Sequence, residues 1–210
     1  MTEPTPSPLK RCSAVLLLGP TGSGKTPLGD LLATRGWQGR RCLHFDFGAE
    51  LRRLVQANRP GEIVSQNEID FLRRVLDSGA LLEDEHFPLA ARILGAFLLA
   101  HDAEEDTWVV LNGLPRHAGQ ARAVEAIVRV RGVVQLQCSA ETVLARIRGN
   151  AGGDRAGRID DDPPAVGRKL ATFRERTAPL VMHYRRQGAW VETIAVTADM
   201  TPEQMWSGIT

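Results

Sequence analysis

The sequence predicts an α/β fold in which a five-stranded parallel sheet is flanked by helices. Five short β-rich runs alternate along the chain with longer helical patterns, which is typical of a doubly wound parallel sheet. The first run, residues 14–18, is apolar throughout, as expected for a strand that is buried on both faces. With 210 residues and 43% hydrophobic content, the chain can form one compact unit with a sizeable core.

The individual elements follow from the spacing of apolar residues and from the turn residues between them. Apolar and β-branched runs predict strands at 14–18, 41–45, 108–111, 133–138 and 190–195. Helical patterns predict helices at 25–34, 49–57, 66–77, 88–100, 119–129, 140–148 and 164–187, with a last helix from Pro202.

Two stretches interrupt this alternation. Residues 46–82 contain helical patterns and no obvious strand, so we expect an inserted helical subdomain there. Residues 149–157, Gly-Asn-Ala-Gly-Gly-Asp-Arg-Ala-Gly, contain too much glycine to form a stable element on their own. This segment is either a surface linker or the hinge of a short lid, and the flanking arginines favour the lid.

Composition narrows the classes of partner. The 26 Lys and Arg side chains nearly balance 25 Asp and Glu side chains, so we expect no nucleic-acid or membrane partner. The cysteines, Cys12, Cys42 and Cys138, form no CxxC pair or Cys/His cluster, which predicts no zinc site and favours a reducing, cytoplasmic setting. Residues 1–10 lack the layout of a signal peptide, and we expect a flexible tail before a single domain at 11–210.

The most specific motif is at residues 19–26, Gly-Pro-Thr-Gly-Ser-Gly-Lys-Thr, a full match to GxxxxGK[ST]. The glycines let the backbone curl so that several N–H groups point at one anion, and the helix that follows adds its positive dipole end. Lys25 can reach the β- and γ-phosphates of ATP, and the Thr26 hydroxyl can coordinate Mg²⁺. The motif therefore predicts a P-loop NTPase that binds ATP through Gly19, Gly22, Ser23, Gly24, Lys25 and Thr26.

Four more segments fit one scheme. They read HFDFGAELR at 44–52, DSGALL at 77–82, WVVLNGLPR at 108–116 and GRIDD at 157–161. Together with the P-loop they resemble adenylate kinase and its relatives, the nucleoside monophosphate kinases, whose segments read HISTGDLLR, GxLV, DGFPR and GRxDD. Further matches are Gln120-Ala121, Ala145-Arg146, Lys169-Leu170, Phe173, Thr177, Pro179-Leu180 and Tyr184. The resemblance covers nearly the whole chain from Ala14, and the short lid is similar to that of short-lid members.

The resemblance implies a role for each matching residue. Arg52 would grip the phosphate of the acceptor, which suits the planar fork of a guanidinium group. Arg116 would lie at the carboxyl end of a strand between donor and acceptor phosphates, and Gln120 would offer its amide to the acceptor base. Arg146 would lie on the donor adenine. The implied acceptor site comprises Phe47, Gly48, Arg52, Gly79, Leu82, Gly113, Arg116, Gln120 and Arg158.

Catalysis of phosphoryl transfer is mainly positioning and electrostatic stabilisation of the transition state. The resemblance implies that Lys25, Arg116, Arg158 and Lys169 supply the positive charge. Closure of the lid would bring Arg158 in and exclude water, which otherwise competes as an acceptor. Replacing lid glycines by proline should therefore slow turnover.

Three of the departures from the family pattern bear on the predicted site. Asn112 stands where the family has an aspartate that helps hold the water shell of Mg²⁺, so we expect weaker, indirect coupling to the metal. Lys169 replaces a phosphate-binding arginine and keeps the charge without the bidentate fork, and Arg168 beside it would point about 100° away on a helix. Phe47 replaces a small residue beside the acceptor site, where a ring would narrow or reshape the base pocket.

The sequence thus predicts transfer of the γ-phosphate of ATP to a nucleoside monophosphate, first of all AMP, and the resemblance to short members of the family implies a monomeric enzyme. CMP or UMP kinase activity is the next reading, because the base pocket carries the most changes. A P-loop kinase for another small molecule fits less well with Arg52, Arg116 and Gln120. A nucleotide-binding regulator with weak transferase activity is the alternative from another class, and the three departures would support it.

Overall fold

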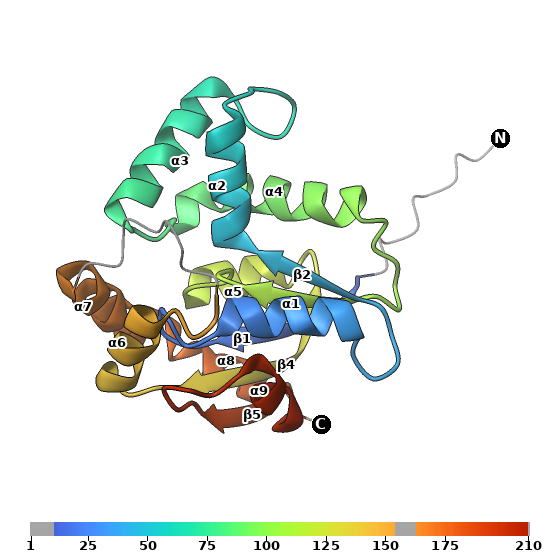
Figure 1. Cartoon of the computed structure of the whole chain (residues 1–210). Coiled ribbons are helices and arrows are strands. Elements are labelled where there is room, and N and C mark those ends of the chain that lie inside the picture. The colour runs from blue at the N-terminus through green and yellow to red at the C-terminus, as the bar shows by residue number, and fades with distance from the viewer. Residues whose placement is uncertain (1–10, 154–162, 210) are drawn as a thin grey trace.

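The computed structural model describes residues 11–153 and 163–209, and it has the predicted α/β architecture (Figure 1). All neighbouring strands are parallel, and their order in the sheet is β2-β3-β1-β4-β5. The strands are β1 (Ser13–Leu18), β2 (Cys42–Asp46), β3 (Trp108–Asn112), β4 (Arg129–Gln137) and β5 (Trp190–Ala195). Strands β2 and β3 each run one residue further than the sequence predicts, which makes Asp46 and Asn112 cross-strand partners.

Helices cover both faces of the sheet. Helices α1 (Lys25–Arg35) and α9 (Pro202–Ser207) lie on one face, and their buried residues share a core cluster with Val15 and Leu17 of β1. Helices α4 (Phe87–Ala100), α5 (Ala118–Val124) and α8 (Leu180–Arg186) form the opposite layer with Ala14, Leu16 and Leu18. Successive side chains of a strand point to opposite faces, so β1 can be apolar throughout and serve both cores.

The segment 46–82 folds as two helices, α2 (Phe47–Ala57) and α3 (Gln66–Ser78), which rise beside β2 above the sheet (Figure 1). A capping box starts α3: the Ser65 side chain accepts from the Glu68 N–H, and the Glu68 side chain accepts from the Ser65 N–H. The apolar residues of both helices join the core cluster of α4. A 3₁₀ turn, η1 (Asp84–His86), links this pair to α4.

The helix expected at 164–187 is three elements: α7 (Pro163–Thr172), a π-helical turn η2 (Phe173–Thr177) and α8. The Ala178 N–H donates to the Phe173 carbonyl five residues back, at 2.8 Å. Pro179 follows, and its ring nitrogen has no hydrogen to donate to the preceding turn. The apolar spacing is continuous across this break, which is why the pattern alone predicts one helix. Helix α6 (Ala140–Gly149) precedes α7 in the chain.

The helix expected at 119–129 is also shorter than predicted. It ends at Val124, and β4 already begins at Arg129, whose N–H donates to the Cys12 carbonyl at 2.9 Å. Pairing with β1 therefore draws this stretch into the sheet, a contact between residues far apart in the sequence.

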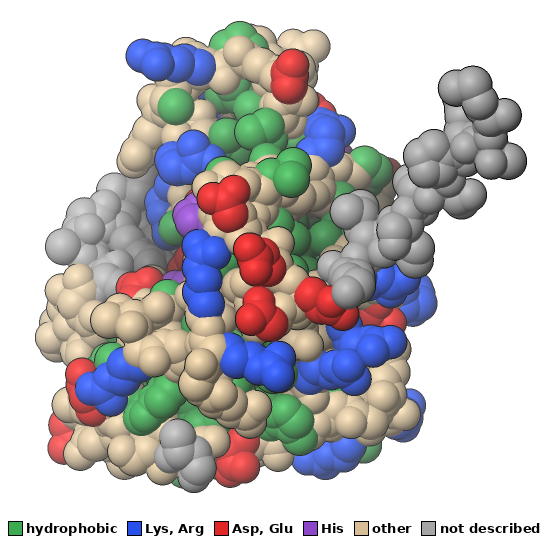
Figure 2. Space-filling view, turned by 90° about the vertical axis from the view of Figure 1, so that its right-hand side faces the viewer, with side chains coloured by type: hydrophobic (Ala, Val, Ile, Leu, Met, Phe, Trp, Pro, Cys, Tyr) green, Lys and Arg blue, Asp and Glu red, His purple; other side chains and the backbone are tan. Residues whose placement is uncertain are grey.

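The expected tail at 1–10, residues 154–157 of the expected lid, and Arg158 lie outside the described residues. In the ranges 11–153 and 163–209, no helix is both long and apolar enough to cross a bilayer. The three cysteines are free thiols, and burial raises the pKa of the Cys42 thiol to about 12, so it stays protonated and unreactive. On the face in Figure 2, basic and acidic side chains are interspersed rather than gathered into a patch of one sign.

Candidate active site

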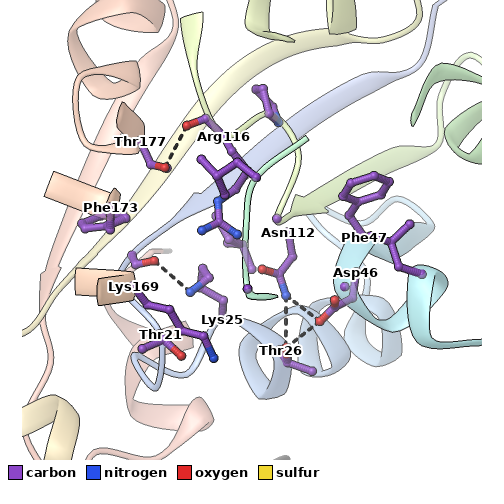
Figure 3. Close-up of a pocket in the computed structure, with 18 of the residues that line it drawn as sticks. Thr21, Lys25, Thr26, Asp46, Phe47, Asn112, Arg116, Lys169, Phe173 and Thr177 are labelled. Atoms are coloured by element: carbon purple, nitrogen blue, oxygen red, sulfur yellow. Dashed lines mark hydrogen bonds between the residues drawn. The ribbon is translucent and has the colours of Figure 1, made fainter. Parts of the chain in front are cut away.

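A pocket opens at the carboxyl ends of β1, β2 and β3, the edge at which parallel α/β sheets bind their ligands (Figure 3). Segments far apart in the sequence meet there: the P-loop, the start of α2, the end of α3, the loop after β3, and α7 with η2. The lining includes the predicted residues Gly19, Gly22, Gly24, Lys25, Thr26, Phe47, Gly48, Arg52, Gly79, Leu82, Asn112, Gly113, Arg116, Gln120 and Lys169. Two predicted residues, Ser23 and Arg146, are buried outside this lining.

The P-loop has the backbone conformation that its glycines make accessible. Gly22 and Gly24 have φ angles of 74° and 98°, which residues with a side chain rarely adopt, and α1 begins directly after them at Lys25. The Lys25 ammonium donates to the carbonyls of Gly19 at 2.8 Å and Pro20 at 2.7 Å, so the lysine lies along the loop. Ser23 is fully buried, and its hydroxyl has no hydrogen-bond partner among the described residues.

Positive charge dominates the pocket. Its charged lining residues, within the described chain, are Lys25, Asp46, Arg52, Arg116 and Lys169. In Figure 3, Lys25, Arg116 and Lys169 lie around one side of the space, while Thr26, Asp46 and Asn112 gather on the other. Four cations and one carboxylate suit a ligand with several phosphate groups.

Arg116 is held by its backbone from two sides. Its N–H donates to the Gln120 side-chain oxygen at 2.8 Å, and its carbonyl accepts from the Thr177 hydroxyl at 2.8 Å. Desolvation lowers the pKa of Arg116 below its ordinary value, but a guanidinium group remains protonated in proteins. A desolvated cation on a fixed backbone at the end of β3 can stabilise negative charge more strongly than a solvated one.

Gln120 is almost fully buried, and both ends of its amide bond to the backbone. Besides accepting from Arg116, it donates from Nε2 to the Leu82 carbonyl at 2.8 Å. Gln120 therefore ties the loop after β3 to the end of the 46–82 segment. Its expected contact with an acceptor base stays a prediction, one that requires an exchange of these bonds.

Arg146 is buried, with only 2% of its surface exposed, behind the P-loop. Its guanidinium donates to the Gly22 carbonyl at 3.1 Å and to the carbonyls of Thr197, Ala198 and Met200 at 2.8, 3.3 and 2.9 Å. This side chain thus joins the P-loop to the loop before α9. The expected contact with a donor adenine stays a prediction beside this structural role.

The ring of Phe47 lies mainly in the core. It is 5% exposed and packs against Phe45, with the ring centroids 6.0 Å apart. Figure 3 shows the ring beside Asp46, at the rim of the group of lining residues. A bulky side chain at this position therefore takes less room from the pocket than its size suggests.

Sequence reasoning missed Asp46, which lies at the centre of the polar group. Its Oδ2 accepts from the Thr26 hydroxyl at 2.6 Å and from the Asn112 amide at 2.8 Å, and its Oδ1 accepts from the Ala49 N–H at 2.9 Å. The signal was present, because Asp46 ends a strand at the ligand-binding edge of the sheet. Thr177 and Phe173 of η2 also line the pocket and were matched only as part of a pattern.

Comparisons with known proteins agree with this geometry. No protein-family model matches the chain. The chain is 32% identical over 179 residues to the adenylate kinase of Stenotrophomonas maltophilia (strain K279a), which covers 83% of this chain and 86% of that protein. It is 31% identical to the adenylate kinase of Xanthomonas campestris pv. campestris (strain B100) and 32% identical to that of Xanthomonas oryzae pv. oryzae (strain MAFF 311018), with the same coverage. Because the relatedness extends over most of both chains, the chain belongs to the adenylate kinase family.

Proposed function

We propose that this protein transfers the γ-phosphate of ATP to AMP, forming two molecules of ADP. The observation that carries the proposal is the basic pocket, in which Lys25 of the P-loop faces Arg116 and Lys169 from other segments. Such an arrangement holds two phosphorylated ligands against each other without covalent chemistry by the protein. We choose AMP as the acceptor because the relatives are named adenylate kinases.

The donor half of the proposed site is the P-loop with α1. Backbone N–H groups of residues 19–26 and the first turn of α1 would surround the phosphates of ATP, and Lys25 would leave the carbonyls of Gly19 and Pro20 to reach them. Mg²⁺ bound with ATP would neutralise part of the charge on the phosphates. An alcohol and a carboxylate, Thr26 and Asp46, are the oxygen donors that this ion prefers.

The acceptor half is the 46–82 subdomain with the loop after β3. Arg52 would bind the AMP phosphate as a bidentate fork, and Gly48 and Gly113 would let the backbone approach it. The adenine would lie against Gly79 and Leu82, next to Gln120.

During transfer, the cations act on the charge that spreads over the moving phosphoryl group. Arg116 would lie between the two ligands, and Lys169 would approach from α7. The proposed lid at 149–157 would add Arg158 and exclude water, which would otherwise hydrolyse ATP. We propose further that the protein is cytoplasmic, in keeping with its free thiols, and that it is a monomer, as the resemblance to short members of the family implies.

The test is a coupled assay of the purified protein with Mg²⁺-ATP and each of AMP, CMP, UMP, GMP and dTMP. We expect rapid formation of ADP with AMP and much slower turnover with the other four. Lys25→Ala should abolish turnover, because no other group supplies its charge from the P-loop. Arg186→Ala, which removes an exposed cation at the end of α8, is the matched control and should keep wild-type rates.

The same panel separates the alternatives. A preference for CMP or UMP would move the acceptor to a pyrimidine nucleotide. Binding of ATP with no transfer to any of the five would favour a regulatory role.

A further inference from the structure

At the edge of the pocket, this chain has a carboxylate on β2, where the family pattern has one on β3. The family segment DGFPR has Asp where this chain has Asn112, and the family segment HISTGDLLR has Ser where this chain has Asp46. These two positions are direct partners across the neighbouring parallel strands β2 and β3. The chain therefore keeps one carboxylate at this point of the sheet, on β2 instead of β3.

The relocated carboxylate contacts the metal-binding alcohol of the P-loop. Asp46 Oδ2 lies 2.6 Å from Thr26 Oγ1, and the Asn112 amide nitrogen lies 3.1 Å from the same hydroxyl and 2.8 Å from Oδ2 (Figure 3). A hydroxyl has one proton to donate and two lone pairs that accept. Thr26 gives its proton to Asp46 and accepts from Asn112, which leaves one lone pair for a cation.

Asn112 complements Asp46, and an aspartate there would not. The amide nitrogen donates to the Asp46 carboxylate at 2.8 Å, whereas a second carboxylate at that position has no hydrogen to donate and would repel it. The Asn112 side chain therefore orients the Asp46 carboxylate beside Thr26. The two departures from the family pattern, each unfavourable alone, are consistent together.

We propose that Asp46, together with Thr26, orders the water shell of the Mg²⁺ bound with ATP, and that Asn112 positions Asp46. This inference deepens the donor half of the proposed function and rests on ATP binding. It replaces the expectation that loss of the aspartate on β3 weakens metal coupling. Because Asp46 also caps α2 through the Ala49 N–H, the same carboxylate links the metal to the helix that carries Arg52.

The experiment measures metal coupling directly and needs no acceptor. The dissociation constant of ATP is measured by calorimetry, once with Mg²⁺ and once with excess EDTA. The readout is the constant with EDTA divided by the constant with Mg²⁺, which is large when the metal strengthens ATP binding. Electron paramagnetic resonance of Mn²⁺ with a non-hydrolysable ATP analogue reports the water shell independently. We expect Asp46→Asn to lower the ratio by about tenfold or more, as for other groups that orient a metal site, and to alter the Mn²⁺ spectrum.

Asn is also a good helix N-cap, so Asp46→Asn keeps the start of α2, and its melting temperature serves as the check on folding. Asp30→Asn removes an exposed carboxylate on α1, one turn beyond Thr26, and should leave the ratio unchanged. The double variant Asp46→Ser/Asn112→Asp returns the carboxylate to β3 and should restore the ratio that Asp46→Asn loses.

A folded Asp46→Asn protein that keeps the wild-type ratio would overturn the proposal. A loss in Asn112→Ala as large as that in Asp46→Asn, with Asp46 intact, would also overturn it, because the amide would then be the principal group. If AMP proves not to be the acceptor while the ratio still falls, the acceptor assignment fails and the metal assignment stands.

Discussion

At the scale of single residues, the site is built by buried polar groups that hold backbone as much as by groups that face the pocket. Gln120 and Thr177 fix the backbone of Arg116, and Arg146 fixes the P-loop at Gly22. Each of these side chains satisfies backbone groups that are removed from water, which makes its own orientation definite. Side chains that hold backbone and side chains that face the pocket both match family motifs, so only the contacts in the structure distinguish the two roles.

Arg116→Ala should lower kcat/KM for AMP by about 10²–10³-fold, because it removes a desolvated cation from the transferring phosphoryl group. Its backbone bonds to Gln120 and Thr177 persist, so we expect little change in the urea midpoint. Steady-state kinetics with Arg122→Ala as a control check this, since Arg122 is an exposed cation on α5. A loss of less than threefold in Arg116→Ala would contradict the assigned role.

Arg146→Ala should destabilise the protein by about 3 kcal/mol, because it leaves buried carbonyls of the P-loop and of the loop before α9 without a donor. Urea denaturation measures this effect. Arg148→Ala, two residues along α6 and exposed, should change stability by less than about 0.5 kcal/mol. If Arg146→Ala instead keeps its stability and loses only ATP affinity, the residue acts on the donor nucleotide.

At the scale of elements, the residues at which strands and helices end determine which side chains lie at the site. Strands β2 and β3 each end one residue later than predicted, and Asp46 and Asn112 are cross-strand partners at these two ends. The π-helical turn before Pro179 places Thr177 against the Arg116 carbonyl, which an uninterrupted helix would carry to a different angle. Such turns often mark functional sites, and this one lines the pocket.

An ion pair joins this turn to the far side of the pocket. Arg176 of η2 donates to both carboxylate oxygens of Glu83, at 2.5 and 2.7 Å. The bond to Arg176 lowers the pKa of Glu83 below its ordinary value of 4.5, so the pair stabilises the fold above that pH and ceases to do so as the pH falls through the lower folded pKa.

Glu83→Gln should therefore lower stability near neutral pH by up to about 1 kcal/mol, since the pair is partly exposed. The difference from wild type should shrink as the pH falls below 4.5 and through the lowered pKa of Glu83, because the wild-type carboxyl then becomes protonated as well. Thermal unfolding across this pH range tests it, with Glu175→Gln as a control on the same turn. A difference that stays constant with pH would mean that packing, not charge, joins the two segments.

At the scale of the whole molecule, the two halves of the pocket belong to separate parts of the chain. The P-loop is anchored on the sheet by Arg146 and β1, while Arg52 stands on α2 above it (Figure 1). In the proposed function, donor and acceptor are brought together and water is kept out, so we expect relative movement of segments around the pocket. The proposed hinge of the lid at 149–157 is one such segment, and Gly152 lies in its described part.

Gly152→Pro should slow turnover by about tenfold, while ATP affinity without acceptor changes little. Proline fixes φ at 152 but keeps the bond from the Gly153 N–H to the Asn150 carbonyl, so the local turn survives. Gly152→Ala should give a smaller effect, since it removes less backbone freedom. Pre-steady-state kinetics separate ATP binding from the later steps of turnover. An unchanged turnover rate in the proline variant would exclude a hinge at this residue.

Much of this protein was determined by the sequence itself. The apolar run at 14–18, the GxxxxGK[ST] motif and the alternation of strand and helix patterns predicted the parallel sheet and the phosphate site, because each depends on neighbouring residues and their period. The 46–82 segment was likewise predicted as helical. The ends of α5 and α7 were not, because strand pairing at Arg129 and the geometry before Pro179 decided them.

Only the tertiary structure decided which polar side chains face one another. Asp46 was missed and Asn112 was interpreted as a loss of charge, because each was compared with a motif on its own strand and not with its partner. Gln120 and Arg146 matched family positions, yet their hydrogen bonds go to backbone that is distant in sequence. Periodicity records how a segment meets the core, whereas the pairing of buried polar groups depends on contacts between strands that the linear sequence does not contain.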